Sequence, residues 1–229
     1  ENQSLKIYCS TQHPTEMQLL ICHALGMNMH QVSVESRRMG GGFGGKESQS
    51  AQWACIASLA AKKTGRPCKL RLDRDDDMSA TGKRHGFAYE WSVAFDDSGV
   101  LQGLKVQLAS NCGFSADLSG PVNERAICHI GNAYYLNAVE LRNLRCKTNT
   151  VSNTAYRGFG GPQGMFVIEN IIDDIARYLD CDPVEIRQRN FFAEQPGAGR
   201  DRMHYGAVVR DNVAPKLVAE LLQSSDYAK

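Results

Sequence analysis

The sequence lacks several features that would place it in a common class of protein. Its 26 basic and 25 acidic residues give a net charge of +1, so there is no electrostatic basis for binding nucleic acid or an anionic membrane. No apolar run approaches the roughly 18 to 20 residues of a membrane span, and residues 1–12 lack the basic-then-apolar layout of a secretion signal. We therefore predict a soluble, cytoplasmic protein with neither a nucleic-acid nor a membrane partner.

Common metal-binding motifs are absent as well. The eight cysteines lie at least 13 positions apart, so there is no CxxC pair, and the six histidines show no HxxxH or HExxH spacing. We expect reduced, mostly buried thiols in place of disulfides or a zinc site. The acidic run 73–77 lacks the spacing and the glycine of a calcium loop, which favours a solvated or loop-capping cluster.

The apolar patterns predict strands and helices that alternate along the chain. The predicted strands are 4–11, 31–38, 68–74 and 138–149, with a hairpin at 87–113 that turns through Asp96-Asp97-Ser98-Gly99. The predicted helices are 15–26, 47–67, 121–134, 165–180, 183–192 and 213–223. This order predicts an α+β or mixed α/β fold. We expect one domain over residues 1–229, with a division into two subdomains near residues 75–85 as the alternative.

Two glycine-rich loops are the most unusual local feature. Residues 39–47 read MGGGFGGKE and residues 155–164 read AYRGFGGPQG, and each loop leads into a predicted helix. Glycine permits positive φ angles and lets a ligand approach backbone N–H groups, while the start of a helix attracts anions. Both loops are therefore candidate cradles for an oxyanion, a phosphate or a metal-bound oxo group. The alternative is that they are tight turns packed closely against neighbouring segments.

Standard phosphate-binding motifs do not account for these loops. Lys46 is followed by Glu47, where a P-loop needs Ser or Thr, and GGGFGG does not fit the GxGxxG fingerprint of a dinucleotide site. Phe43 and Phe159 stand inside glycine runs, so each packs either into a core or onto a planar ligand. Glu47 and Arg157 lie close by, and a carboxylate, a guanidinium and an aromatic ring together favour a planar polar heterocycle.

The motifs STQ, MGGGFGGKE, NERA and SNTAYRGFGGPQG closely resemble the large molybdenum subunit of the xanthine dehydrogenase and aldehyde oxidase family of molybdenum hydroxylases. The resemblance runs from about residue 4 to about residue 192. It implies that residues 1–229 are the first molybdenum-cofactor-binding domain of a larger subunit. It also implies an oxidoreductase of purine catabolism, which oxidises hypoxanthine or xanthine to urate by water-derived hydroxylation.

The same resemblance assigns cofactor-binding residues. It implies that Gln12, Gly42, Phe43, Gly44 and Arg157 bind molybdopterin. Gln12 corresponds to a glutamine that hydrogen-bonds the apical oxo ligand. Phe43, through its backbone, and Arg157 correspond to positions that line the molybdenum centre. These residues form the environment of the metal without ligating it, because the sulfurs of the pterin hold the molybdenum.

Three further residues are implied to face the substrate. Glu47 corresponds to the glutamate that hydrogen-bonds the purine ring, and Phe159 to one of two phenylalanines that sandwich it. Arg125 corresponds to the arginine that orients the purine and stabilises charge developing on its carbonyl oxygen, as a preplaced guanidinium does well. Glu47 and Arg125 are the implied catalytic pair, which aldehyde oxidases usually lack. The alternatives are a hydroxylase of another N-heterocycle or an aldehyde, a non-catalytic module of the same fold, and an anion- or nucleotide-binding domain.

Several parts of the family pattern have no match in these 229 residues. The catalytic general base, the alanine-bearing loop that precedes it and the second stacking phenylalanine are missing, and Tyr156 stands where phenylalanine is common. No C-x4-C-x2-C iron–sulfur pattern and no flavin motif occurs. The resemblance therefore implies a fragment that is inactive in isolation. Its implied partners are the rest of the large subunit and an iron–sulfur/FAD subunit carrying 2Fe-2S and FAD, in a dimer of heterodimers.

Overall fold

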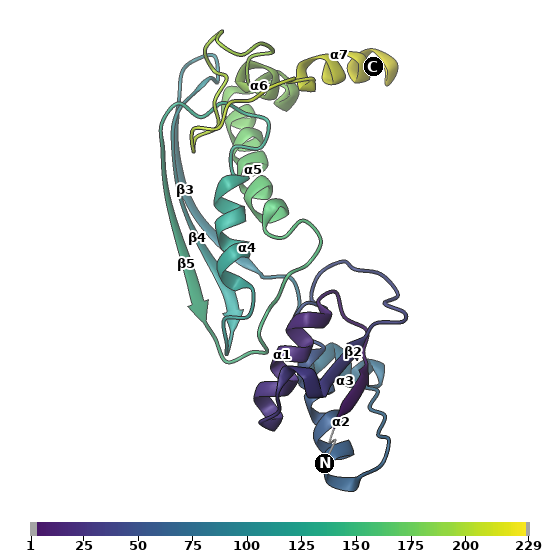
Figure 1. Ribbon diagram of the computed structural model, residues 1–229. Coiled ribbons are helices and arrows are strands. Elements are labelled where there is room, and N and C mark those ends of the chain that lie inside the picture. Colours follow the sequence, from purple (N-terminus) through teal and green to yellow (C-terminus); the bar gives the residue numbers. More distant parts are fainter. Residues whose placement is uncertain (1–3, 228–229) are drawn as a thin grey trace. The chain divides into compact units, whose positions relative to one another are not determined.

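The computed structural model describes residues 4–227, which form two units built from interleaved segments (Figure 1). Unit 1 contains the chain up to His85 together with Asn111–Gly120 and Cys146–Phe159. Unit 2 contains Gly86–Ser110, Pro121–Arg145 and the chain from Gly160 onward. The chain passes between the units several times, so residues far apart in sequence become neighbours within each unit.

Unit 1 begins with a parallel strand pair. β1 (Leu5–Tyr8) pairs with β2 (Val32–Glu35), and α1 (Pro14–Leu25) and the short helix η1 (Met29–Gln31) connect them. Parallel strands need a crossover connection, and α1 provides it. The apolar face of α1 packs into the core of the unit. α2 (Ala51–Thr64) completes the small core, whose buried residues are Met17, Ile21, Cys22, Val32, Ala51 and Ala54. The predicted strands at 4–11 and 31–38 and the helix at 15–26 are confirmed.

Two predictions for unit 1 are wrong. The segment 68–74 alternates like a strand, but no strand forms there, since it pairs with no strand in the described part of the chain. Instead α3 (Arg74–Ala80) begins at its end, where the Asp73 side chain accepts a hydrogen bond from the Asp76 N–H at 2.8 Å. The acidic run therefore caps a helix and places carboxylates in its first turn. The helix predicted at 47–67 starts only at Ala51, after a turn.

Unit 2 is a three-stranded sheet covered by a long helix. The strands are β3 (Phe87–Phe95), β4 (Leu101–Gly113) and β5 (Val139–Lys147), in the order β3-β4-β5. β3 and β4 form the predicted antiparallel hairpin, in which Asp96 caps the turn and Gly99 has a φ of +82°. Figure 1 shows α5 (Gly161–Leu179) lying along the sheet.

The core of unit 2 lies between α5 and β4. Ile168, Ile171 and Ile172 of α5 are fully buried and belong to one apolar cluster with Val106 and Leu108 of β4. The helical spacing of these isoleucines places them on one face of the helix. The remaining helices are α4 (Ser119–Cys128), α6 (Pro183–Asn190) and α7 (Ala214–Ser224). α4 is shorter than the helix predicted at 121–134, whose second half forms turns.

The cysteines differ from their prediction. All eight are free, as expected, but only Cys22 and Cys112 are buried, and Cys68 and Cys128 are exposed. Cys68 lies in the segment that fails to form a strand, which explains its exposure. Within residues 4–227, no helix combines the length and the apolar character that crossing a membrane requires.

We expect the Ile172→Ala variant to lower the free energy of unfolding by about 3 kcal/mol. The Ile172 side chain is 0% exposed at the centre of the unit 2 core, so its truncation loses apolar burial and leaves a cavity. Leu221→Ala on α7 is the matched control, because Leu221 is 62% exposed and should change stability by less than about 0.5 kcal/mol. Chemical denaturation measures both, and equal losses would contradict this location of the core.

Candidate functional site

Gln12 lies just after β1 and is held against the first glycine loop. Its backbone N–H donates to the carbonyl of Lys46 at 3.0 Å, and its side-chain Oε1 accepts from the N–H of Gly44 at 3.1 Å. Thr11 Oγ1 donates to the same Lys46 carbonyl at 2.8 Å. Because Oε1 already has a protein donor, the Nε2 group keeps two N–H donors, for which the described residues supply no acceptor. Gln12 is therefore able to donate to a ligand.

The first glycine loop is closed by Lys46 and depends on glycine where it meets Gln12. Lys46 Nζ donates to the carbonyls of Met39 and Gly41, the latter at 3.0 Å, so its charge is used inside the loop. A Cβ added at Gly42 would lie 3.2 Å from the side chain of Gln12. Glycine at this position therefore lets the loop approach the glutamine amide, as a ligand cradle requires.

The two glycine motifs contact each other directly within unit 1. The N–H of Arg157 donates to the carbonyl of Phe43 at 2.7 Å. A Cβ at Gly44, where φ is +99°, would lie 2.6 Å from the carbonyl oxygen of Ala155. Gly44 therefore supports the interpretation as a tightly packed turn, while Gly42 supports the interpretation as a cradle. The tight packing is thus observed, and the ligand cradle stays a prediction.

Glu47 lies in the turn between the first glycine loop and α2. Its side chain is half-buried, and its Oε2 atom is buried without a hydrogen-bond partner among residues 4–227. A buried carboxylate oxygen without a donor costs free energy, so this atom is a candidate acceptor for a ligand donor or an ordered water.

The aromatic residues of the two loops differ from each other. Phe43 is 58% exposed, so its ring is not part of a core in the described chain. Phe159 is half-buried and has a φ of +50°, which is uncommon for a residue with a side chain. The Arg157 side chain is exposed beside them. Two aromatic rings and a guanidinium are thus available for a ligand.

Arg125 belongs to unit 2, where it lies on α4 with an exposed side chain. Its Nε–H donates to Nε2 of His129, one helical turn later, at 3.2 Å. Burial lowers the pKa of His129, and the charge of Arg125 lowers it further, so the imidazole stays neutral and able to accept this bond. His129 thereby holds the guanidinium, whose terminal N–H groups keep their capacity to bind an anionic oxygen.

The structure thus gathers most of the predicted site residues in unit 1. Direct hydrogen bonds link Gln12 to Gly44 and Phe43 to Arg157, and Gly42 packs against Gln12. One residue of this region, Asp117, is not marked by any motif. It lies just before α4 and accepts hydrogen bonds from side chains next to both glycine motifs. Its sequence signal, an acidic residue before a helix, predicts only a helix cap.

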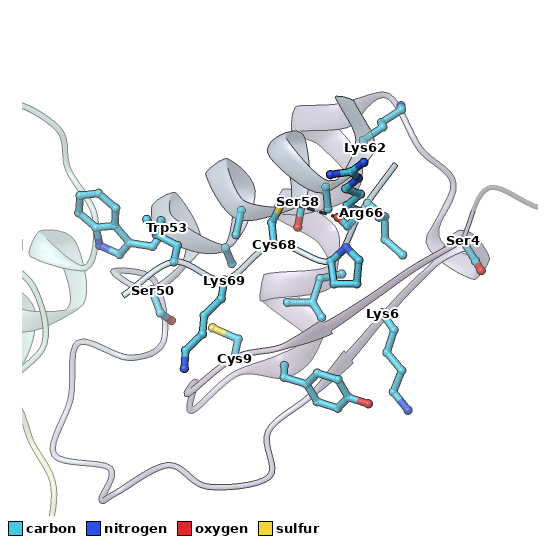
Figure 2. Close-up of a pocket in the computed structure, with 18 of the residues that line it drawn as sticks. Ser4, Lys6, Cys9, Ser50, Trp53, Ser58, Lys62, Arg66, Cys68 and Lys69 are labelled. Carbon is cyan, nitrogen blue, oxygen red and sulfur yellow. Dashed lines mark hydrogen bonds between the residues drawn. The ribbon is translucent and has the colours of Figure 1, made fainter. Parts of the chain in front are cut away.

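A pocket of ≈ 1110 Å³ lies elsewhere in unit 1, between β1, α2 and residues 65–70 (Figure 2). Its lining includes Lys6, Lys62 and Lys69, together with Trp53 and Cys9. None of the predicted cofactor or substrate residues lines it. It is bounded by the free edge of the two-stranded sheet and by the segment that fails to form a strand, so we do not assign it to the cofactor.

We expect acid to destabilise the chain in part through His85. This residue is 2% exposed, its Nε2 lies 2.7 Å from Ser119 Oγ, and burial lowers its pKa below the ordinary value of 6.5 despite the opposing charge of Asp117. Because the pKa of His85 is lower in the folded state, the neutral imidazole contributes its full stability above pH 6.5. That contribution is lost as the pH falls through the pKa of the folded state. Denaturation between about pH 7.5 and 5.5 should therefore show a shallower pH dependence for His85→Gln. Parallel curves for the two proteins would contradict it.

Comparisons with known proteins identify the family of this chain. The model of the molybdopterin cofactor-binding domain family matches residues 1–191. The xanthine dehydrogenase of Calliphora vicina is 43% identical over 99% of this chain, and the nicotinate hydroxylase of Emericella nidulans is 41% identical over 99%. The chain spans 16% of the length of each of these relatives.

A solved structure shows the same fold. The aldehyde oxidoreductase of Desulfovibrio gigas matches with a TM-score of 0.88 and 26% identity, over 98% of this chain and 24% of that one. The predicted α+β fold, the family resemblance and the molybdopterin cofactor are thereby confirmed. The residues of unit 1 also fit such a cofactor, because Gln12 offers amide donors and Gly42 leaves room beside them. The chain belongs to the molybdopterin cofactor-binding domain family of molybdenum enzymes.

Proposed function

We propose that this chain is part of the large subunit of a molybdenum hydroxylase that oxidises hypoxanthine or xanthine to urate. The observation that carries the proposal is the buried Oε2 of Glu47, which lacks a donor in the described chain and follows the loop that holds Gln12. A purine has ring N–H groups that fit such an acceptor. The likeness to xanthine dehydrogenases supports the same substrate class.

The cofactor-facing residues would act by binding and orientation. When bound, the molybdenum cofactor supplies the two-electron oxidation of the substrate. Gln12 donates from its free Nε2 group, and glycine at position 42 lets the loop backbone approach that amide without side-chain interference. Arg157 is fixed by its backbone bond to Phe43, which leaves its exposed guanidinium available to the cofactor environment.

The substrate-facing residues would hold and polarise the purine. Glu47 accepts a hydrogen bond from the ring, Phe159 packs on its face, and Arg125 stabilises negative charge on its carbonyl oxygen. We assign the general base to the remainder of the subunit, because no segment of these 229 residues matches the one that carries it in the family. The 2Fe-2S and FAD groups are assigned to other domains or a partner subunit, in a dimer of heterodimers located in the cytoplasm.

Nicotinate is the second candidate substrate, because a nicotinate hydroxylase is among the relatives at 41% identity. Its carboxylate would pair well with the guanidinium of Arg125. Its pyridine ring, however, offers no N–H donor to Glu47 at neutral pH, and its carboxylate would repel that side chain. The unpaired carboxylate oxygen of Glu47 therefore favours a purine.

The test is a comparison of substrates with the complete cofactor-loaded protein. We expect kcat/KM for xanthine or hypoxanthine to exceed that for nicotinate and for a simple aldehyde by about a hundredfold, the worth of one well-formed charge-assisted hydrogen bond with its desolvation. A preference for nicotinate would replace the purine assignment. A preference for the aldehyde would remove the proposed function of Glu47.

Replacing Arg125 by lysine should lower kcat/KM toward the purine by about tenfold in the complete protein. Lysine keeps the positive charge but loses the planar fork and the bond to His129. Steady-state kinetics measure the effect. Arg142→Lys, at an exposed position on β5, is the matched control and should leave kcat/KM unchanged. Equal kcat/KM values for the two variants would contradict the assignment of Arg125 to the substrate.

A further inference from the structure

Asp117 is a convergence point for hydrogen bonds within unit 1. Its Oδ2 accepts from Gln49 Nε2 at 2.6 Å and from Ser48 Oγ at 2.9 Å. Its Oδ1 accepts from Thr154 Oγ1 at 2.8 Å, and the N–H of Leu118 donates to the same atom. Both carboxylate oxygens are thus used by donors from three separate places in the sequence.

The donors belong to the segments that carry the proposed site. Ser48 and Gln49 directly follow Glu47, and Thr154 is 3% exposed and lies three positions before Arg157. Asp117 itself is half-buried and has a φ of +42°, an unusual conformation for aspartate that these bonds help to maintain. Charge-assisted bonds of this kind are stronger than neutral ones. One carboxylate therefore ties the Glu47 turn to the second glycine motif.

The Gln49 amide extends this arrangement. Its Oε1 accepts from the N–H of Gly82 at 2.9 Å, so its Nε2 must face Asp117. An asparagine at position 117 would offer one oxygen and one NH2 group to donors on both sides. With its NH2 group toward Gln49 it would lose that bond, and with its NH2 group toward Thr154 it would lose the bond from the Leu118 N–H, which can only donate.

We propose that Asp117 is a positioning residue for the substrate contact of Glu47. It acts by fixing Ser48 and Gln49 against Thr154, which sets the path of the backbone at Glu47. Asp117 does not touch the substrate, and the proposal rests on the proposed function of Glu47 as the substrate contact. It assigns to Asp117 an effect on substrate binding that acts through Glu47, and no effect on the redox step.

The first test measures local order in the complete protein without any substrate. We expect Asp117→Asn to increase amide hydrogen exchange in residues 46–50 and 153–157 by about tenfold, as expected for the loss of one charge-assisted bond, while α5 stays protected. Asp97→Asn, at an exposed position of the β3–β4 turn, should change neither segment. Unchanged exchange in both segments of Asp117→Asn would overturn the proposal.

The second test is a double-mutant cycle with Glu47 in the complete, cofactor-loaded protein. Asp117→Asn should raise KM about tenfold and change kcat by less than about twofold. In a Glu47→Ala background it should raise KM by less than about twofold, because the contact that it positions is gone. A tenfold increase in both backgrounds would show a structural effect that does not act through Glu47, and would overturn the proposal.

The two tests separate this inference from the proposed function. If the unaltered protein fails to turn over a purine, the proposed function fails, and the cycle is run with nicotinate. The exchange measurement does not depend on the substrate, so it decides in either case whether Asp117 holds the two segments together.

Discussion

The Glu47→Ala variant of the complete protein is expected to lose at least about a hundredfold in kcat/KM toward a purine. The Oε2 atom of Glu47 is buried without a partner in the described chain, so its desolvation is compensated only when a ligand donor binds. Removing the carboxylate removes that contact, which we expect to persist in the transition state. KM should therefore rise with little change in kcat, so that kcat/KM falls, and cofactor content should remain unchanged.

The measurement is steady-state kinetics alongside a molybdenum assay of the same preparations. Glu220→Ala on α7 is the matched control, since this glutamate is exposed and belongs to unit 2. A Glu47→Ala enzyme that retains the kcat/KM of the unaltered protein would show that Glu47 does not contact the substrate. Loss of molybdenum from this variant would instead assign Glu47 to cofactor binding.

The Gly44→Ala variant is expected to lose most of its bound molybdenum cofactor. A Cβ at this position would lie 2.6 Å from the carbonyl oxygen of Ala155 and 2.9 Å from the Cα of Tyr156. Both are backbone atoms, so the two glycine motifs must separate, and the bond between Arg157 and Phe43 is lost with them. We expect this steric clash and the strain of a positive φ of +99° to destabilise the loops together by about 3 kcal/mol.

The Gly40→Ala variant of the same loop separates the effect of backbone strain from the effect of the steric clash. Gly40 also has a positive φ, of +71°, but a Cβ there would meet no atom within 4 Å. It should therefore cost only about 1 kcal/mol from the backbone conformation and retain the cofactor. Molybdenum content and thermal unfolding measure both variants. Equal cofactor loss would show that contact between the two motifs is not what the site requires.

The parts of the structure that the sequence predicted well are those specified by local patterns. The β3–β4 hairpin follows from period-2 alternation around a turn with Asp96 and Gly99, and α5 follows from the spacing of its isoleucines. The two glycine motifs predicted a site, which stays a prediction, and the structure places the two motifs in direct contact. Their identification with molybdopterin depended on family resemblance, because glycine loops alone fit several ligands.

The sequence predicted poorly where a residue depends on distant partners. Residues 68–74 have the alternation of a strand, but a strand forms only if another strand pairs with it, and none in the described chain does. Asp117 has no motif because its side-chain donors lie 37 to 69 positions away. The unpaired oxygen of Glu47 likewise follows from packing around it, which no local pattern encodes.

The most direct test of the account is an electron cryomicroscopy map of the complete protein with its cofactor and a purine bound. We predict molybdenum cofactor density against Gln12 and residues 42–44, and a ring N–H of the purine within hydrogen-bond distance of Glu47. Cofactor density in the pocket between β1 and α2, or a purine without contact to Glu47, would contradict it (Figure 2).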